Sequence, residues 1–200
     1  MTENWLILAG VEGAEPKLPI DTQVPGVSAA IWETVSGGSA LGTAEPPEYP
    51  WVIAVEGDVL HEAAAAMDYI LETVPTGAAA TPERFEEIYR RDDVVGIAAD
   101  GRDIFYAHIT VRNMDLAPLH NWYNNVHLPE VGAVGLVAGQ RFRSLDAERA
   151  FLALYRPETI EVLRSDAIKA VRGLGGFEDD VVAFSRLEAR CAARRTGAID

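Results

Sequence analysis

Apolar residues along this chain follow two patterns, short runs typical of buried strands and longer stretches with helical spacing. Apolar positions three and four residues apart predict helices over 58–73, 81–91 and 157–171. Thr81 is a suitable N-cap for the second of these, with Pro82 at its first helical position. Short apolar runs bounded by glycine, proline or charged residues predict strands over 5–11, 27–35, 51–56, 94–99, 104–111, 140–145, 151–155 and 181–185.

The two halves of the chain repeat the same order of elements. Segment 51–55 followed by a helix corresponds to 151–155 followed by a helix, and each half can be written β-(α)-β-β-α-β, the ferredoxin-like order. A proline-punctuated loop leaves no room for the first helix of the first half. We therefore expect an α+β protein with a degenerate ferredoxin-like half over 1–100, a second ferredoxin-like half over 101–190 and a tail over 191–200. The charged chain after residue 187 is expected to be peripheral or loosely helical.

The segment just after residue 115 concentrates the candidate chemistry. His120, Tyr123 and His127 are spaced by three and four residues, so on a helix they share one side. Leu116 and Leu119 begin the same side, which indicates that it faces protein. Pro129 is expected to end the helix sharply. The pattern predicts a short amphipathic helix that carries ionisable groups against a core.

A second set of polar side chains is expected on strand 104–111. Alternation places Tyr106, His108 and Thr110 on one face and the more apolar residues on the other. His108 is expected to reach the same cleft as the His127 helix.

The formal net charge of −14 disfavours nucleic acid and anionic membranes as partners. Cys191 is the single cysteine, so no intrachain disulfide can form and a cytoplasmic location is the simplest expectation. The N-terminus shows neither a basic n-region nor a long apolar run, so neither a signal peptide nor a membrane span is expected. We expect a small-molecule substrate and leave a homodimer open.

The helix segment resembles a motif of dimeric α/β-barrel proteins, notably EthD-like ones. The motif reads Trp122-Tyr123, then His127, then Pro129-Glu130, and the resemblance extends over about residues 104–186. It implies two ferredoxin-like units whose sheets form a barrel, here within one chain, and a ligand cleft between a sheet and its helices. Similar members include cofactor-free polyketide and olivetolic-acid-type cyclases, muconolactone isomerases, small quinone-forming monooxygenases, dye-decolourising peroxidases and haem-degrading enzymes.

The resemblance implies a role for His127, and the roles of the other candidates follow from their chemistry and position. His127 matches the position that serves as acid or base in the cyclase-like members, and the alternative is a structural histidine that caps a carbonyl. Tyr123 is expected to hold a developing oxyanion or else to pack with its hydroxyl satisfied. Glu130 is a candidate to orient His127, or a solvated acid. Candidate substrate-binding residues are His108, Tyr106, Trp122, His120 and Arg141. The pattern favours Trp122 as a core or interface anchor, and the alternative for Arg141 is an ion pair with an acid.

No metal site or cofactor is expected. Three histidines invite a metal, but no spaced carboxylate or cysteine completes a ligand set, and the spacing between His120 and His127 is seven rather than four. The leading hypothesis is a cofactor-independent acid/base enzyme of cyclase, isomerase or lyase type that acts on a small apolar carbonyl or aromatic compound. The alternatives are a small monooxygenase or haem-handling protein on the same fold, and a non-catalytic ligand-binding or assembly protein.

Overall fold

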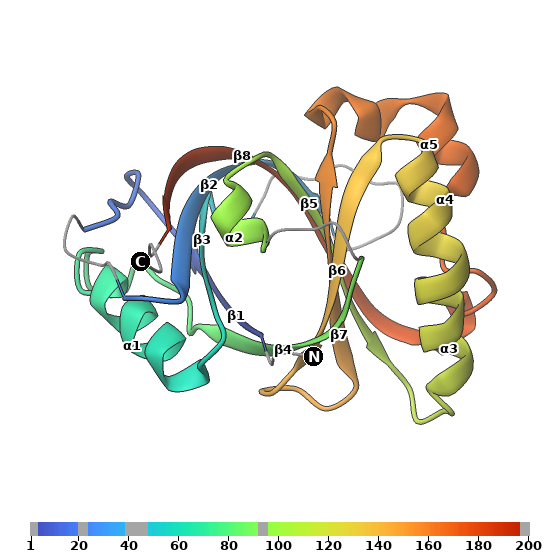
Figure 1. Cartoon of the computed structure of the whole chain (residues 1–200), viewed down its shortest axis with the longest axis horizontal. Coiled ribbons are helices and arrows are strands. Elements are labelled where there is room, and N and C mark those ends of the chain that lie inside the picture. Colours follow the sequence, from blue (N-terminus) through green and yellow to red (C-terminus); the bar gives the residue numbers. More distant parts are fainter. Residues whose placement is uncertain (1–3, 20–23, 39–47, 92–95, 197–200) are drawn as a thin grey trace.

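The computed structural model describes residues 4–19, 24–38, 48–91 and 96–196. Their strands form one closed antiparallel barrel in the order β1-β3-β2-β8-β5-β7-β6-β4 (Figure 1). The strands are β1 (Trp5–Val11), β2 (Val27–Gly38), β3 (Trp51–Gly57), β4 (Glu83–Arg90), β5 (Ile104–Val111), β6 (Leu136–Ser144), β7 (Ala150–Pro157) and β8 (Val181–Thr196).

Helices cover the outside of the barrel on two sides (Figure 1). The long helix α1 packs on the first half, and α3 to α5 pack on the second. The short helix α2 lies across the barrel opening and places Ala98 in the barrel core. The helical elements are α1 (Leu60–Leu71), α2 (Ile97–Asp100), α3 (Ala117–Trp122), the π-helical η1 (Tyr123–His127), α4 (Leu128–Ala133), η2 (Ile160–Arg164), α5 (Asp166–Val171) and η3 (Glu178–Asp180).

Each half of the barrel has the ferredoxin-like strand order. The first half runs β4-β1-β3-β2 and the second β8-β5-β7-β6, so the fourth strand lies beside the first in both. No helix separates β1 from β2 in the described residues between them, which agrees with the degenerate first half. The predicted fold class, an α+β protein of two ferredoxin-like halves in an intramolecular barrel, is confirmed.

The two halves join through β2 with β8 and β4 with β6. Strand β8 is long enough to pair with β5 and then continue along β2, from Gly38 opposite Arg186 to Ser28 opposite Thr196. The prediction of a peripheral or loosely helical tail after residue 187, and of a separate tail over 191–200, is therefore wrong as far as Thr196. Leu187 and Ala189 are buried in the barrel core, and β2 needs β8 as its hydrogen-bonding partner. Residues 197–200 lie outside the described chain.

Two further elements differ from the sequence prediction. The expected helix over 81–91 is strand β4, because its backbone bridges β1 and β6 and its Phe85 side chain fills the barrel core. Closing the barrel therefore overrides the capping pattern of Thr81 and Pro82. The strand expected over 94–99 falls partly outside the described residues, and its described end begins helix α2.

The helix that carries His127 does not end at Pro129. Helix α3 passes through the π-helical turn η1 directly into α4, and the Leu128 N–H bonds the Tyr123 carbonyl five residues back. Pro129 then stands at the start of α4, directly after the π-helical turn, whose wider geometry lets the helix continue although proline has no N–H to donate. The predicted sharp exit is wrong for this reason. In the described residues no helix is long and apolar enough to cross a membrane.

Candidate functional site

A small cavity lies between the sheet of the second half and its helices. We call it the helix-face cavity. Its volume is about 80 Å³. The walls are mainly aromatic and aliphatic, with contributions from Phe105, Tyr123, His127, Tyr155, Leu163 and Ile168.

His127 presents its imidazole to this cavity from the end of the π-helical turn. The side chain is buried, with 7% of its surface exposed. The ring stacks on Trp122, with centroids 4.7 Å apart, and meets Tyr123 and Tyr155 edge-on at 5.3 and 6.2 Å. Its Nδ1 is buried and has no hydrogen-bond partner in the described structure. A buried polar atom without a partner is uncommon and marks a group available to a ligand.

Burial, and after it the positive charge of Arg141, lowers the pKa of His127 to about 4. The imidazole is therefore neutral at physiological pH. A neutral imidazole in a cavity wall can accept a proton or a hydrogen bond from a bound molecule.

Arg141 is a buried cation on the same side of the sheet. It extends from β6 with 1% of its surface exposed, and its guanidinium lies 4.2 Å from the centroid of the Tyr123 ring. Its Nη1 donates to Asn124 Oδ1 at 2.8 Å and its Nη2 to His120 Nδ1 at 3.1 Å. Among the residues that the structure describes, no carboxylate forms an ion pair with it. An uncompensated cation so placed favours negative charge in its surroundings.

Two tyrosines, Tyr123 and Tyr155, add polar groups to the cavity wall, which Arg172 and Arg186 also line. Burial raises the pKa of Tyr123, with Arg141 acting in the opposite direction, and burial also raises the pKa of Tyr155 well above its ordinary value. Both side chains therefore remain protonated and carry an O–H that can donate a hydrogen bond. Tyr155 stands at the end of an apolar strand run, and nothing in its local pattern distinguished it from a packing residue.

The structure brings together some of the residues that the sequence singled out. Trp122, Tyr123 and His127 form one aromatic cluster, and His120 joins it through Arg141. Burial and Arg141 both lower the pKa of His120, whose ring also meets Phe151 edge-on.

Other candidates lie elsewhere. Glu130 is exposed on α4, and Nδ1 of His127 has no partner, so the expected relay between them is not formed. Tyr106 and His108 point into the barrel, whereas Phe105 and Ala107 from the same strand face the helix-face cavity. The expectation that His108 shares the cleft of His127 is therefore wrong, because strand alternation places the sheet between them. The described residues contain no cluster of three side chains suited to hold a metal.

Comparison with known proteins shows the fold only. No family model matches the sequence, and no curated protein matches it significantly. Among solved structures, an anthrone oxidase-like protein matches with a TM-score of 0.66 and 9% identity over 99% of this chain and 94% of its own. A candidate monooxygenase from Fusobacterium nucleatum matches with a TM-score of 0.60 and 8% identity, over 98% and 94%. A mutant chlorite dismutase from Candidatus Nitrospira defluvii, in complex with cyanide, matches with a TM-score of 0.54 and 9% identity, over 94% and 90%.

Haem, which the resemblance implies for some members, does not fit the site as built. Pockets for drug-sized molecules occupy about 300–1,000 Å³, and a porphyrin is no smaller than such molecules. The helix-face cavity beside His127 has only about 80 Å³. The shared feature is thus the fold, a closed barrel of two ferredoxin-like halves, and the chemistry has to be argued from this chain's own residues.

Proposed function

We propose that the protein is a cofactor-free oxygenase that uses molecular oxygen to oxidise a small phenol or an enolisable aromatic ketone in the helix-face cavity. One observation carries the proposal. His127 is a neutral, buried imidazole that lines an aromatic-walled cavity, and its Nδ1 has no hydrogen-bond partner. The names of the structural neighbours, a candidate monooxygenase and an anthrone oxidase-like protein, support oxygen chemistry over other uses of the same base.

The first step is a proton transfer to His127. Nδ1 takes the proton of a phenolic O–H, or of a C–H next to a carbonyl, and leaves a resonance-stabilised anion. The low pKa of His127 reflects burial without a counter-charge. The substrate anion supplies that counter-charge as the proton moves, so the imidazolium is stabilised only when the reaction proceeds. The Tyr123 hydroxyl donates to the anion, and the Arg141 charge against the Tyr123 ring strengthens it as a donor.

The second step adds oxygen to the anion. The substrate anion gives electrons to O₂, and a C–O bond forms to give a hydroperoxide. The O–O bond then breaks. One oxygen stays on carbon as a carbonyl, and the other leaves as water with the hydroxyl proton and the C–H hydrogen. A phenol with a free para position is thereby converted to a quinone with one O₂ consumed and one water released.

The cavity size limits the substrate. A cavity of about 80 Å³ accommodates only the reacting edge of an aromatic ring system, so the rest of the substrate lies at the cavity opening. A single hydroxylated edge, as in 1-naphthol, meets this requirement. Apart from His127, the two tyrosines, Arg172 and Arg186, the walls are apolar, so they favour a largely apolar substrate.

The test measures oxygen uptake with 1-naphthol, and quinone formation by its absorbance. We expect the native protein to consume oxygen above the rate in buffer, and His127→Ala to lose about 10²-fold or more, as for removal of a general base. His61→Ala is the matched control because His61 is an exposed histidine on α1. Circular dichroism confirms that each variant is folded. Equal oxygen uptake by the native protein and His127→Ala would overturn the proposal.

A cyclase, isomerase or lyase is the second candidate. It needs only the base and the oxyanion donor, which His127 and Tyr123 provide with rings 5.3 Å apart. Turnover of an enolisable ketone that proceeds unchanged under argon would favour this reading. A purely structural role for His127 is disfavoured, because its Nδ1 is left without the backbone partner that such a role requires.

A further inference from the structure

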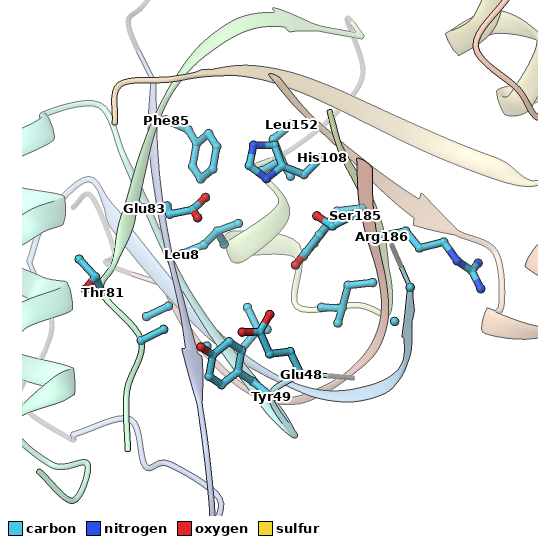
Figure 2. A pocket seen from close by; sticks show the side chains of 18 residues that line it. Leu8, Glu48, Tyr49, Thr81, Glu83, Phe85, His108, Leu152, Ser185 and Arg186 are labelled. Carbon is cyan, nitrogen blue, oxygen red and sulfur yellow. The ribbon is translucent and has the colours of Figure 1, made fainter. Parts of the chain in front are cut away.

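A larger cavity lies inside the barrel, on the other face of the sheet from His127. We call it the barrel cavity. Its volume is about 320 Å³, within the range of small-molecule sites of about 300–1,000 Å³. Figure 2 shows the side chains around it, with Leu8, Phe85, Leu152 and His108 on its walls. The two cavities draw on alternate residues of β5, so a ligand in one does not contact a ligand in the other.

His108 provides the buried polar atom of this cavity. Its ring meets Phe85 edge-on, with centroids 5.8 Å apart, and its Nε2 is buried without a hydrogen-bond partner in the described structure. Burial lowers the pKa of His108, while Glu83 acts in the opposite direction. The ring is neutral at physiological pH, so it offers one hydrogen bond to a ligand without repelling a cation.

The charges around the barrel cavity are negative. Glu83 and Glu48 place their carboxylates at its rim, where both side chains are exposed (Figure 2). Arg186 belongs to the wall through β8, but its guanidinium turns away and its Nη1 donates to Glu188 Oε1 at 3.2 Å. Burial raises the pKa of Tyr106 to about 12, and the charges of Glu83 and Glu48 act in the same direction.

We propose that the barrel cavity is a second binding site, for a small organic cation with an apolar or aromatic body. The body lies against Phe85, Leu152 and Tyr106, and an ammonium group reaches Glu83 and Glu48 at the rim. The aromatic rings of Tyr106 and Tyr49 add a surface that favours cations. This site goes beyond the proposed oxygenase function, because it shares only Arg186 with the lining of the helix-face cavity.

Calorimetry with three probes of one shape tests the chemistry of the ligand. They are 2-phenylethylamine, which is a cation at neutral pH, 2-phenylethanol, which is neutral, and phenylacetate, which is an anion. We expect the amine to bind most tightly and phenylacetate not to bind. Equal binding of all three, or no binding of the amine, would overturn the proposal.

Substitutions then locate the binding. Glu83→Gln is expected to weaken the amine roughly two- to fivefold, as for an ion pair at an exposed rim. Glu86→Gln is its matched control, because Glu86 lies on the same strand but pairs with Arg143 outside the cavity. Ser185→Trp, at the exposed mouth, is expected to block binding, whereas Val182→Trp adds the same ring at a position that is 65% exposed and outside the cavity.

The readout is independent of catalysis. His127→Ala is expected to leave amine binding unchanged, so failure of the oxygenase proposal would not affect this one. Amine binding that is insensitive to Ser185→Trp would place the ligand elsewhere and overturn the assignment.

Discussion

The indole of Trp122 lies nearly parallel to the imidazole of His127, with ring centroids 4.7 Å apart and planes inclined by 26°. Gly175 packs against this indole so closely that an added Cβ would overlap it. The loop after α5 therefore fixes the indole, and the indole fixes the imidazole. The orientation of the proposed base depends on a glycine 48 positions away in sequence.

Gly175→Ala is expected to displace Trp122 and destabilise the fold by about 1–3 kcal/mol, through overlap with the indole and a φ of +62°. Turnover should fall with it, because the His127 ring loses its stacking partner. Gly176→Ala is the matched control. Its φ is +90°, but nothing lies within 4 Å of the added Cβ. Urea unfolding measures the stability of the two variants, and tryptophan fluorescence reports the displacement of the indole. Equal losses of stability in the two variants would contradict a role for the contact between Gly175 and Trp122.

The pH profile of kcat/KM reports the pKa of the free base. The neutral form of His127 is the reactive one, and its folded pKa lies at about 4 rather than 6.5. Activity should therefore persist as the pH is lowered from 7 to 5 and decline only as it falls through about 4. An acid limb centred near 6.5 would contradict the proposed role.

Arg141→Met is expected to raise the pKa of His127, because it removes the neighbouring positive charge. It should also slow turnover, by less than the roughly hundredfold loss that follows removal of a direct oxyanion donor. Arg143→Met is the matched control, since Arg143 lies two residues along the same strand but is exposed and pairs with Glu86. An NMR titration of His127 in both variants measures the shift. A fall in its pKa in Arg141→Met would be the wrong sign.

Glu56 organises a buried polar cluster inside the barrel near α2. Its carboxylate accepts hydrogen bonds from Asn4 Nδ2 at 2.7 Å, Gln140 Nε2 at 3.0 Å and the Ala98 N–H at 3.0 Å. Glu56→Ala leaves these buried donors without this acceptor and should cost about 3 kcal/mol in the free energy of unfolding. Glu72→Ala, at the exposed end of α1, should change it by about 0.5 kcal/mol or less. Comparable losses in chemical denaturation would contradict the role of Glu56.

More of the fold than of the candidate site could be predicted from the sequence. Strand-length apolar runs and the repeated order of elements predicted two ferredoxin-like halves, because burial of one face leaves a local periodicity. Strand β4 was mistaken for a helix, since Thr81 and Pro82 form a good helix start and only barrel closure makes the segment a strand. The prediction of a peripheral tail after residue 187 is wrong for the same reason. That segment forms β8 because it pairs with β2, which is distant in sequence.

The candidate site could be predicted only where its residues share one helix. The spacing of Tyr123 and His127 places both at the helix-face cavity. Strand alternation separated Tyr106 and His108 from their neighbours, but it could not say which face of β5 meets the helices. Tyr155 and Gly175 come from distant strands and loops, and no local pattern links them to His127.

The most direct test of His127 as the base is an NMR titration of its ring in the free protein. The proposed mechanism requires an imidazole that remains neutral until about pH 4, and the titration should show the chemical shifts of the neutral ring down to that pH. A midpoint at or above the ordinary value of about 6.5 would contradict it, because the ring would then be either open to solvent or paired with a carboxylate.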